Sequence, residues 1–171
     1  MIVLRFRVAA LFFALALFLG LGGISVAAIP QTGSPAPNFS LELIANGRGT
    51  VSLDKYKGKG LYLNFFASWC VPCKAEVPSI TQLSKAYAKR GVVVLGVDEL
   101  ESVAAAKGFI SRFNVPYPVG MDDSGALGAS YGLIGLPLHI FIGPDGKLVA
   151  RRSGQMSEDQ IRAALDQIAR K

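Results

Sequence analysis

An almost wholly apolar run, Gly60 to Phe66, constrains the fold of this chain of 171 residues more than any other segment. Continuous apolar character over such a length is typical of a strand that other elements cover on both faces of a sheet. The run leads into Cys73 to Arg90, where apolar residues recur at steps of three and four until Gly91. This spacing predicts an amphipathic helix, which Pro78 is expected to kink. A buried strand followed directly by a helix favours an α/β fold.

The elements on either side predict a mixed sheet. A second apolar run, Val92 to Val97, precedes a helical pattern from Ser102 to Phe113, and this repeated order implies parallel pairing. Turn residues at Asn46-Gly47 and at Gly143 to Gly146 predict two hairpins, which pair residues 39–43 with 49–52 and residues 138–142 with 147–151. A last helix is expected to begin after Ser157, a residue that favours the N-cap position. The predicted architecture is an α/β sandwich around a mixed central sheet.

The first 29 residues predict an export leader. Arg5 and Arg7 precede an apolar run from Val8 to Ile29, which is the usual order of charge and apolar residues in such segments. Small residues at positions 25–28 offer a signal peptidase site, whereas the length of the run is enough to span a bilayer, and we favour the uncleaved anchor. The basic start places the rest of the chain outside the cytoplasm. The predicted organisation is a signal peptide or transmembrane anchor over 1–29, a tether over 30–37 and a single domain over 38–171.

The charge pattern indicates a solvated surface. The chain carries 18 basic and 12 acidic residues, a net charge of +6, but the basic residues are scattered and are not interleaved with aromatic side chains. This pattern disfavours a nucleic-acid partner. Weak attraction to anionic lipid is the more natural use of the excess, and the predicted membrane contact is made by the N-terminal segment.

The only two cysteines of the chain, Cys70 and Cys73, stand where the first buried strand ends and its helix begins. The N–H groups and the dipole of a helix N-terminus favour the thiolate form of Cys70. Cys73 stands one helical turn further on, where its thiol can attack a mixed disulfide formed at Cys70. The spacing therefore indicates a redox-active disulfide, Cys70 to Cys73, that needs no other cofactor.

Two other uses of the cysteines are less well supported. A structural disulfide across so short a loop would restrain the unfolded chain little. Structural zinc sites use four protein ligands and catalytic sites three, while the chain offers two cysteines and a single histidine, His139. No metal site is therefore predicted.

Three further strings stand out, which are NFFASWCVPCKAEVP at 64–78, YGLIGLP at 131–137 and PDG at 144–146. Through these strings, and from about Ala36 to Ala169, the sequence resembles the TlpA/ResA-like family of membrane-tethered thioredoxin-fold thiol–disulfide oxidoreductases. The resemblance implies a thioredoxin-like fold with an N-terminal hairpin and a helix-containing insertion over Glu101 to Val119. It also implies that Pro137 is a cis-proline facing the cysteines and that the Leu136 backbone can pair with a bound polypeptide. The substrate-binding residues implied are Trp69, Leu136 and Pro137.

Acidic residues accompany these elements. Glu76 stands three residues after Cys73, so the two share one side of the predicted helix. A glutamate on a helix is usually solvated, but the resemblance implies that Glu76 is buried and acts as a proton acceptor and donor for the thiols. Asp98 and Glu99, at the end of the second buried strand, are expected to add negative potential. Glu101 is expected to belong to the start of the next helix.

The chain departs from the family at two places. Phe66 stands where members often carry tryptophan, and Leu138 and His139 stand where small hydroxyl residues are common. The second change makes the substrate-facing loop more apolar. His139 is expected to be a core or edge histidine without a chemical role.

The functional hypothesis is an extracytoplasmic thiol–disulfide oxidoreductase that reduces disulfides in exported proteins. The resemblance implies apocytochrome c or its maturation partners as clients and a membrane-embedded thiol transporter as the electron donor. A net disulfide oxidant stays open, because the sequence does not set the reduction potential. A copper-binding chaperone on the same fold would use both cysteines and His139, although such relatives usually space their cysteines by three residues. A peroxidase is less favoured, because Ala67 stands where a threonine would be needed.

Overall fold

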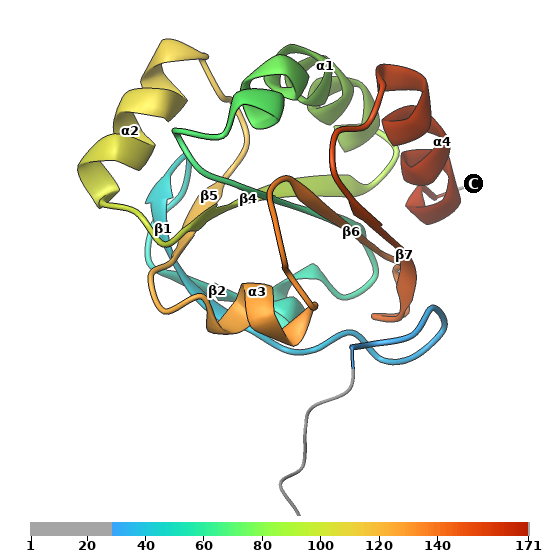
Figure 1. Cartoon of the computed structure of the whole chain (residues 1–171). Coiled ribbons are helices and arrows are strands. Elements are labelled where there is room, and N and C mark those ends of the chain that lie inside the picture. Colours follow the sequence, from blue (N-terminus) through green and yellow to red (C-terminus); the bar gives the residue numbers. More distant parts are fainter. Residues whose placement is uncertain (1–28, 171) are drawn as a thin grey trace, which may run out of the picture.

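The computed structural model describes residues 29–170, so most of the predicted leader lies outside the described residues. The strands are β1 (Ser40–Ala45), β2 (Thr50–Ser52), β3 (Gly60–Phe66), β4 (Val92–Glu99), β5 (Val119–Asp122), β6 (Leu138–Ile142) and β7 (Leu148–Ser153). The helices are the 3-10 turn η1 (Leu53–Tyr56) and α1 (Val71–Ala88), α2 (Val103–Arg112), α3 (Ala126–Ser130) and α4 (Glu158–Ile168). The strands form one mixed sheet in the order β2-β1-β5-β4-β3-β6-β7 (Figure 1).

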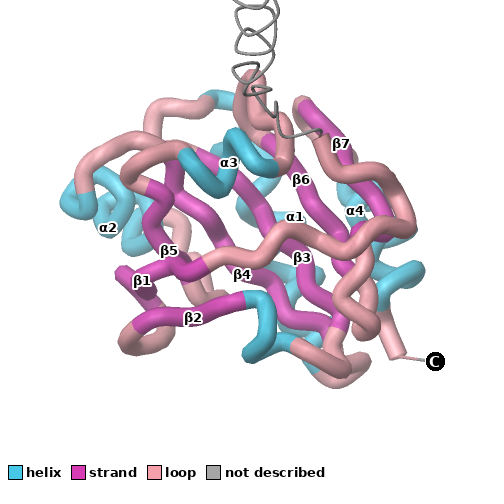
Figure 2. The backbone as a smooth tube through the Cα atoms, turned by 90° about the horizontal axis from the view of Figure 1, so that it is seen from below, coloured by secondary structure: helices cyan, strands magenta, loops and turns pink. Residues whose placement is uncertain are grey.

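The sheet lies between two layers of helices. Helices α1, α2 and α4 cover one face and α3 lies on the other, as the views from the side and from below agree (Figures 1 and 2). Tyr62 and Phe66 of β3 pack into the core under α1 and α4, whereas Leu61, Leu63 and Phe65 pack into the core of the opposite face. All seven residues of β3 are buried. The continuous apolar run therefore has the predicted cause, burial on both faces.

The central pairings place the end of β3 beside two other chain segments. Strands β3 and β4 are parallel, with Phe66 opposite Asp98. Strands β3 and β6 are antiparallel, with Phe65 opposite Leu138. The loop after β3, the loop after β4 and the loop before β6 consequently meet at one edge of the sheet.

Both predicted hairpins are present, as β1–β2 and β6–β7, whereas β5 and α3 were not predicted. Strand β5 has four residues, pairs parallel to β4 and antiparallel to β1, and so joins the N-terminal hairpin to the central sheet. Helix α3 has five residues. Elements of this length show too little hydrophobic periodicity to be recognised in the sequence.

The segment expected to be a tether, residues 30–37, is part of the fold. The Gly33 amide donates to the Leu148 carbonyl at 2.7 Å, and the Leu148 amide donates to the Ser34 carbonyl at 2.9 Å. Ala36 is buried in the core beneath these contacts. The ordered domain therefore begins before residue 38, because the proline-containing segment finds hydrogen-bond partners along β7.

Serine caps fix the starts of two helices. The Ser102 side chain accepts from the Ala105 amide at the start of α2, and Ser157 forms a reciprocal capping box with Gln160 at the start of α4. Pro78 lies inside α1, where the predicted helix already included it. Within residues 29–170, none of the helices combines the length and the apolar character of a bilayer span.

Candidate redox site

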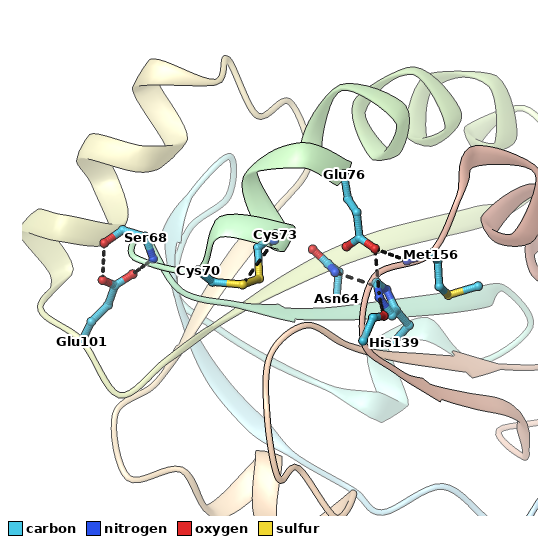
Figure 3. The surroundings of a disulfide bond; sticks show 9 residues. Asn64, Ser68, Cys70, Cys73, Glu76, Glu101, His139 and Met156 are labelled. Atoms are coloured by element: carbon cyan, nitrogen blue, oxygen red, sulfur yellow. Dashed lines mark hydrogen bonds and ion pairs between the residues drawn. A yellow bond between two sulfur atoms is a disulfide. The ribbon is translucent and has the colours of Figure 1, made fainter.

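Cys70 and Cys73 are joined by a disulfide at the N-terminus of α1. The two Cα atoms are 5.3 Å apart. Cys70 is the N-cap residue, and its Sγ accepts a hydrogen bond from the Cys73 amide at 3.2 Å (Figure 3). A sulfur at this position receives the N–H groups and the positive end of the helix dipole, which stabilise a thiolate. The geometry thus favours Cys70 as the nucleophile of the reduced pair.

Exposure does not distinguish the two cysteines in the disulfide form. Each is 3% exposed. What differs is their place in the helix, since Cys70 caps α1 while Cys73 already belongs to its first turn. The assignment of the attacking thiol therefore depends on the helix N-terminus.

The Leu136–Pro137 peptide bond is cis, as expected from the resemblance. The pairing of Phe65 with Leu138 puts Pro137 at the sheet edge where β3 passes into the cysteine loop. The Pro137 carbonyl accepts from the Gly154 amide at 2.9 Å. No backbone hydrogen bond joins Leu136 to the rest of the chain between residues 29 and 170. Its backbone is therefore available to an extended polypeptide.

Apolar side chains are exposed at the same edge of the sheet. Trp69 and Val71, on either side of Cys70, are 65% and 73% exposed. Ile134, in the loop that leads to Pro137, is 93% exposed, and Leu100, after β4, is 65% exposed. We refer to Trp69, Val71, Leu100 and Ile134 as the apolar rim. Large apolar side chains exposed together mark a surface for contact with another molecule.

Glu76 is buried, as the resemblance implied, and is not a solvated helix charge. Its side chain is enclosed between α1 and the sheet, and Oε1 accepts a hydrogen bond from the Met156 amide (Figure 3). Among the described residues, no group donates to Oε2. Cys73 and Glu76 stand three residues apart on the buried side of α1, one helical turn from each other. One carboxylate oxygen of Glu76 is therefore held by a backbone donor, and the other has no hydrogen-bond partner in the described chain.

His139 lies in the core beside Glu76. The ring is fully buried, and its Nε2 is 3.1 Å from the Gly154 carbonyl and 3.5 Å from Glu76 Oε1. Its Nδ1 is 2.8 Å from the Tyr62 hydroxyl and 3.4 Å from Asn64 Nδ2. The expected core histidine is therefore confirmed, but its contact with Glu76 was not foreseen, because β6 and α1 are far apart in the sequence.

The acidic residues at the end of β4 are buried and do not add negative charge at neutral pH. Burial, followed by the nearby carboxyls of Glu101 and Glu99, raises the pKa of Asp98 to about 9. Burial, followed by Asp122, raises the pKa of Glu99 to about 8. Within the described part of the chain, none of the four oxygens of Asp98 and Glu99 has a hydrogen-bond partner. The expectation of negative potential is therefore wrong, because desolvation favours the neutral acids.

Glu101 was expected at the start of the next helix, but it reaches the cysteine loop. Its Oε1 accepts from the Ser68 amide at 2.6 Å and its Oε2 from the Ser68 hydroxyl at 2.5 Å (Figure 3). Helix α2 is capped by Ser102 instead. The contact joins the loop after β4 to the residue that stands two positions before Cys70, and no sequence pattern indicates it.

Similarity to known proteins identifies the family of this chain. The Redoxin family model matches residues 31–168. This chain belongs to the redoxin family. It is 38% identical over 129 residues to the thiol-disulfide oxidoreductase ResA of Bacillus subtilis strain 168, which covers 75% of this chain and 71% of that protein. The namesake from Bacillus thuringiensis subsp. konkukian is 33% identical over 138 residues, 81% of this chain and 79% of that protein.

Solved structures show the same fold. The exposed lipoprotein thioredoxin Etrx1 of Streptococcus pneumoniae superposes with a TM-score of 0.68 at 35% identity, covering 77% of this chain and 99% of that one. With the cysteine pair at the start of α1, this redoxin chain is a thiol–disulfide oxidoreductase of the ResA type, and the resemblance found in the sequence is confirmed.

The buried acids predict a pH dependence of stability. A carboxyl whose pKa is raised by folding binds more protons in the folded than in the unfolded chain. Its stabilising effect is complete below the unfolded value of about 4 and is lost as the pH rises toward about 9 for Asp98 and about 8 for Glu99. We therefore expect Asp98→Asn, which resembles the neutral acid, to reduce the loss of stability between about pH 5 and about pH 8.

Urea unfolding at the two pH values measures this effect. The control is Glu158→Gln, which removes a carboxyl that pairs with Arg162 on α4 and should leave the pH dependence unchanged. An Asp98→Asn variant that loses as much stability as the wild type would contradict a neutral Asp98.

Proposed function

We propose that this protein is an extracytoplasmic oxidoreductase that reduces disulfides in exported proteins, with Cys70 as the attacking residue. The observation that carries the proposal is the capping of α1 by Cys70 Sγ, which receives the Cys73 amide at 3.2 Å. This is the arrangement that activates a thiolate. In the oxidised protein the same Sγ is bonded to the sulfur of Cys73. The two thiols of the reduced pair together supply the two electrons that reduce a client disulfide.

The reaction proceeds by two exchanges. The Cys70 thiolate attacks one sulfur of a client disulfide, so a mixed disulfide forms and the second client sulfur leaves as a thiolate. Cys73 then gives up its proton and attacks Cys70 Sγ, which forms the Cys70–Cys73 disulfide and releases the first client sulfur as a thiolate. The client takes up two electrons and, in total, two protons. Glu76, one turn beyond Cys73, is the proposed acceptor of the Cys73 proton.

The proposed client surface is the loop edge around Cys70. The side chains of the apolar rim are exposed, and Trp69 and Val71 stand on either side of the nucleophile in the sequence. The Leu136 backbone, which has no partner in the described chain, can pair with an extended client beside Pro137. Apolar contacts and main-chain pairing both suit unfolded polypeptides, which expose such groups.

An extracytoplasmic location is supported by the apolar run of residues 8–29 after Arg5 and Arg7. The name of the pneumococcal relative, an exposed lipoprotein, points the same way for that protein. A reductant is useful in an oxidising compartment only if it is recharged. We therefore propose a membrane-embedded thiol transporter as the electron donor and apocytochrome c as one client.

The copper-chaperone alternative receives no support from His139. Both ring nitrogens lie within hydrogen-bond distance of protein groups, Nδ1 of the Tyr62 hydroxyl and Nε2 of the Gly154 carbonyl. Over residues 29–170, no group of three or more His, Cys, Asp or Glu side chains is arranged to hold a metal ion. A ligand set of both cysteines and His139 would require the buried ring to leave its partners.

A first prediction from the proposed function separates the roles of the two cysteines. Cys70→Ala should abolish disulfide exchange, whereas Cys73→Ser should accumulate mixed disulfides through Cys70, because the resolving thiol is missing. Mass spectrometry of the trapped adducts from an extracytoplasmic fraction identifies the client. Equal trapping by Cys73 in a Cys70→Ser variant would contradict the assignment.

A second prediction concerns Glu76. Its negative charge should disfavour a further charge on either thiol, so Glu76→Gln should lower the apparent thiol pKa values and make the reduction potential less negative. The side-chain carbonyl oxygen of the glutamine can still accept from the Met156 backbone amide, so the fold should be retained. Thiolate absorbance against pH and equilibration with glutathione measure the two quantities. Unchanged values in a folded variant would refute the proton role, and the wild-type potential decides between a reductant and a net oxidant.

The leader generates a third prediction. If residues 8–29 stay attached as a membrane anchor, the full chain should fractionate with membranes and resist extraction by high salt. Detergent should release it. A mature chain that begins near Ala28 or Ile29 and stays in solution would show a cleaved signal peptide instead, and would leave the redox chemistry unaffected.

A further inference from the structure

His139 lies next to the buried carboxylate of Glu76. The ring is fully buried, and its Nε2 lies 3.5 Å from Glu76 Oε1 (Figure 3). A histidine here brings a ring with two polar nitrogens into a core that also holds a carboxylate.

The hydrogen bonds of His139 fix which nitrogen carries the proton. The Gly154 carbonyl, 3.1 Å from Nε2, can only accept, so Nε2 is the protonated nitrogen. Nδ1 of the neutral ring then accepts from the Tyr62 hydroxyl at 2.8 Å. Burial, followed by the charge of Glu76, raises the pKa of Tyr62 well above its ordinary value, so this hydroxyl keeps the proton that it donates. The protonated nitrogen, Nε2, lies 3.5 Å from Glu76 Oε1.

We propose that His139 is a positioning residue for the redox reaction, which stabilises the negative charge of Glu76 through Nε2–H and keeps Oε1 turned away from the thiols. This proposal rests on the proposed role of Glu76 as the proton acceptor. Oε1 accepts from the Met156 amide and lies 3.5 Å from His139 Nε2, so the proposal leaves proton exchange with the thiols to Oε2. Figure 3 shows Oε1 turned toward His139 and Met156, while the other carboxylate oxygen points away from them.

The remaining charged and titratable groups around Glu76 do not supply the same effect. Tyr62 faces it from β3, and Tyr117 faces it from the segment before β5, where burial and the Glu76 charge both raise the tyrosine pKa. Arg152 pairs with His139 across β6 and β7 but is exposed, so solvent screens its charge. Cys70 and Cys73 are the other titratable residues on the side of α1 that carries Glu76. Among the described residues, His139 is the side chain within ion-pair range of the carboxylate, at 3.5 Å from Oε1.

The experiment measures the apparent thiol pKa and the reduction potential of the reduced full-length protein. His139→Phe keeps a ring but removes both nitrogens, so the polar contact 3.5 Å from Glu76 Oε1 is lost. We expect a shift in the direction of the Glu76→Gln shift and at least half as large, with the potential less negative. His139→Gln, which retains an N–H donor, should restore most of the wild-type behaviour. His139→Leu serves as the second donor-free variant if His139→Phe does not fold.

A double-mutant cycle tests whether His139 acts through Glu76. In a Glu76→Gln background, His139→Phe should produce no further shift, because the charge that it controls is already absent. Tyr62→Phe is the matched control: it removes a buried hydrogen bond from the same ring but leaves Nε2–H held by Gly154. It should lower stability and leave the thiol pKa within error of the wild type.

Three results would overturn the proposal. The first is a folded His139→Phe or His139→Leu variant with wild-type thiol pKa values while Glu76→Gln shifts them, which would reject His139 and spare Glu76. The second is an equal shift in both backgrounds, which would show an effect independent of the carboxylate. The third is a Glu76→Gln variant without any shift, which would reject both residues while trapping by Cys70 still supports the oxidoreductase.

Discussion

The capping of α1 by Cys70 connects the chemistry of this chain to its packing, because a thiol can occupy a helix N-terminus only if the preceding strand delivers it there. Strand β3 is buried along its whole length between two layers, so its end is a fixed point. Only residues 67–70 lie between the end of β3 and the start of α1, and the last of them is the N-cap Cys70. The hydrogen bond from the Cys73 amide to Sγ follows from this placement. Activation of the nucleophile is therefore a consequence of how the core is built.

The buried acidic residues around the site differ in whether a hydrogen-bond donor contacts them. Glu76 has an N–H donor from Met156 and the polar edge of His139, which compensate for lost solvation. Asp98 and Glu99 have no such donors among the described residues, and burial raises their pKa values to about 9 and about 8. The three buried carboxyls thus differ in their hydrogen-bond donors, and desolvation keeps Asp98 and Glu99 neutral.

The long elements and the redox pair could be predicted from the sequence, because β3 and α1 carry strong periodicity and Cys70 stands at their junction. The cis-peptide before Pro137 came from family resemblance, since the residues alone favour trans. The contacts that tune the site could not be predicted. Glu101 meets Ser68, and Glu76 meets His139, across separations that only the sheet order resolves. The pairing of Gly33 with Leu148 was missed for the same reason, as proline-rich composition gives no sign of a hydrogen-bonded neighbour.

That last pairing also protects the molecule from unwanted association. Strand β7 is an outer strand of the sheet, and unpaired outer strands invite other chains to add themselves and aggregate. Gly33 and Ser34 occupy the hydrogen-bonding groups of Leu148, and the charged Arg152 follows further along the strand. The opposite outer strand, β2, is only three residues long. The N-terminal segment and the short β2 therefore reduce the number of main-chain groups that the two outer strands offer to other chains.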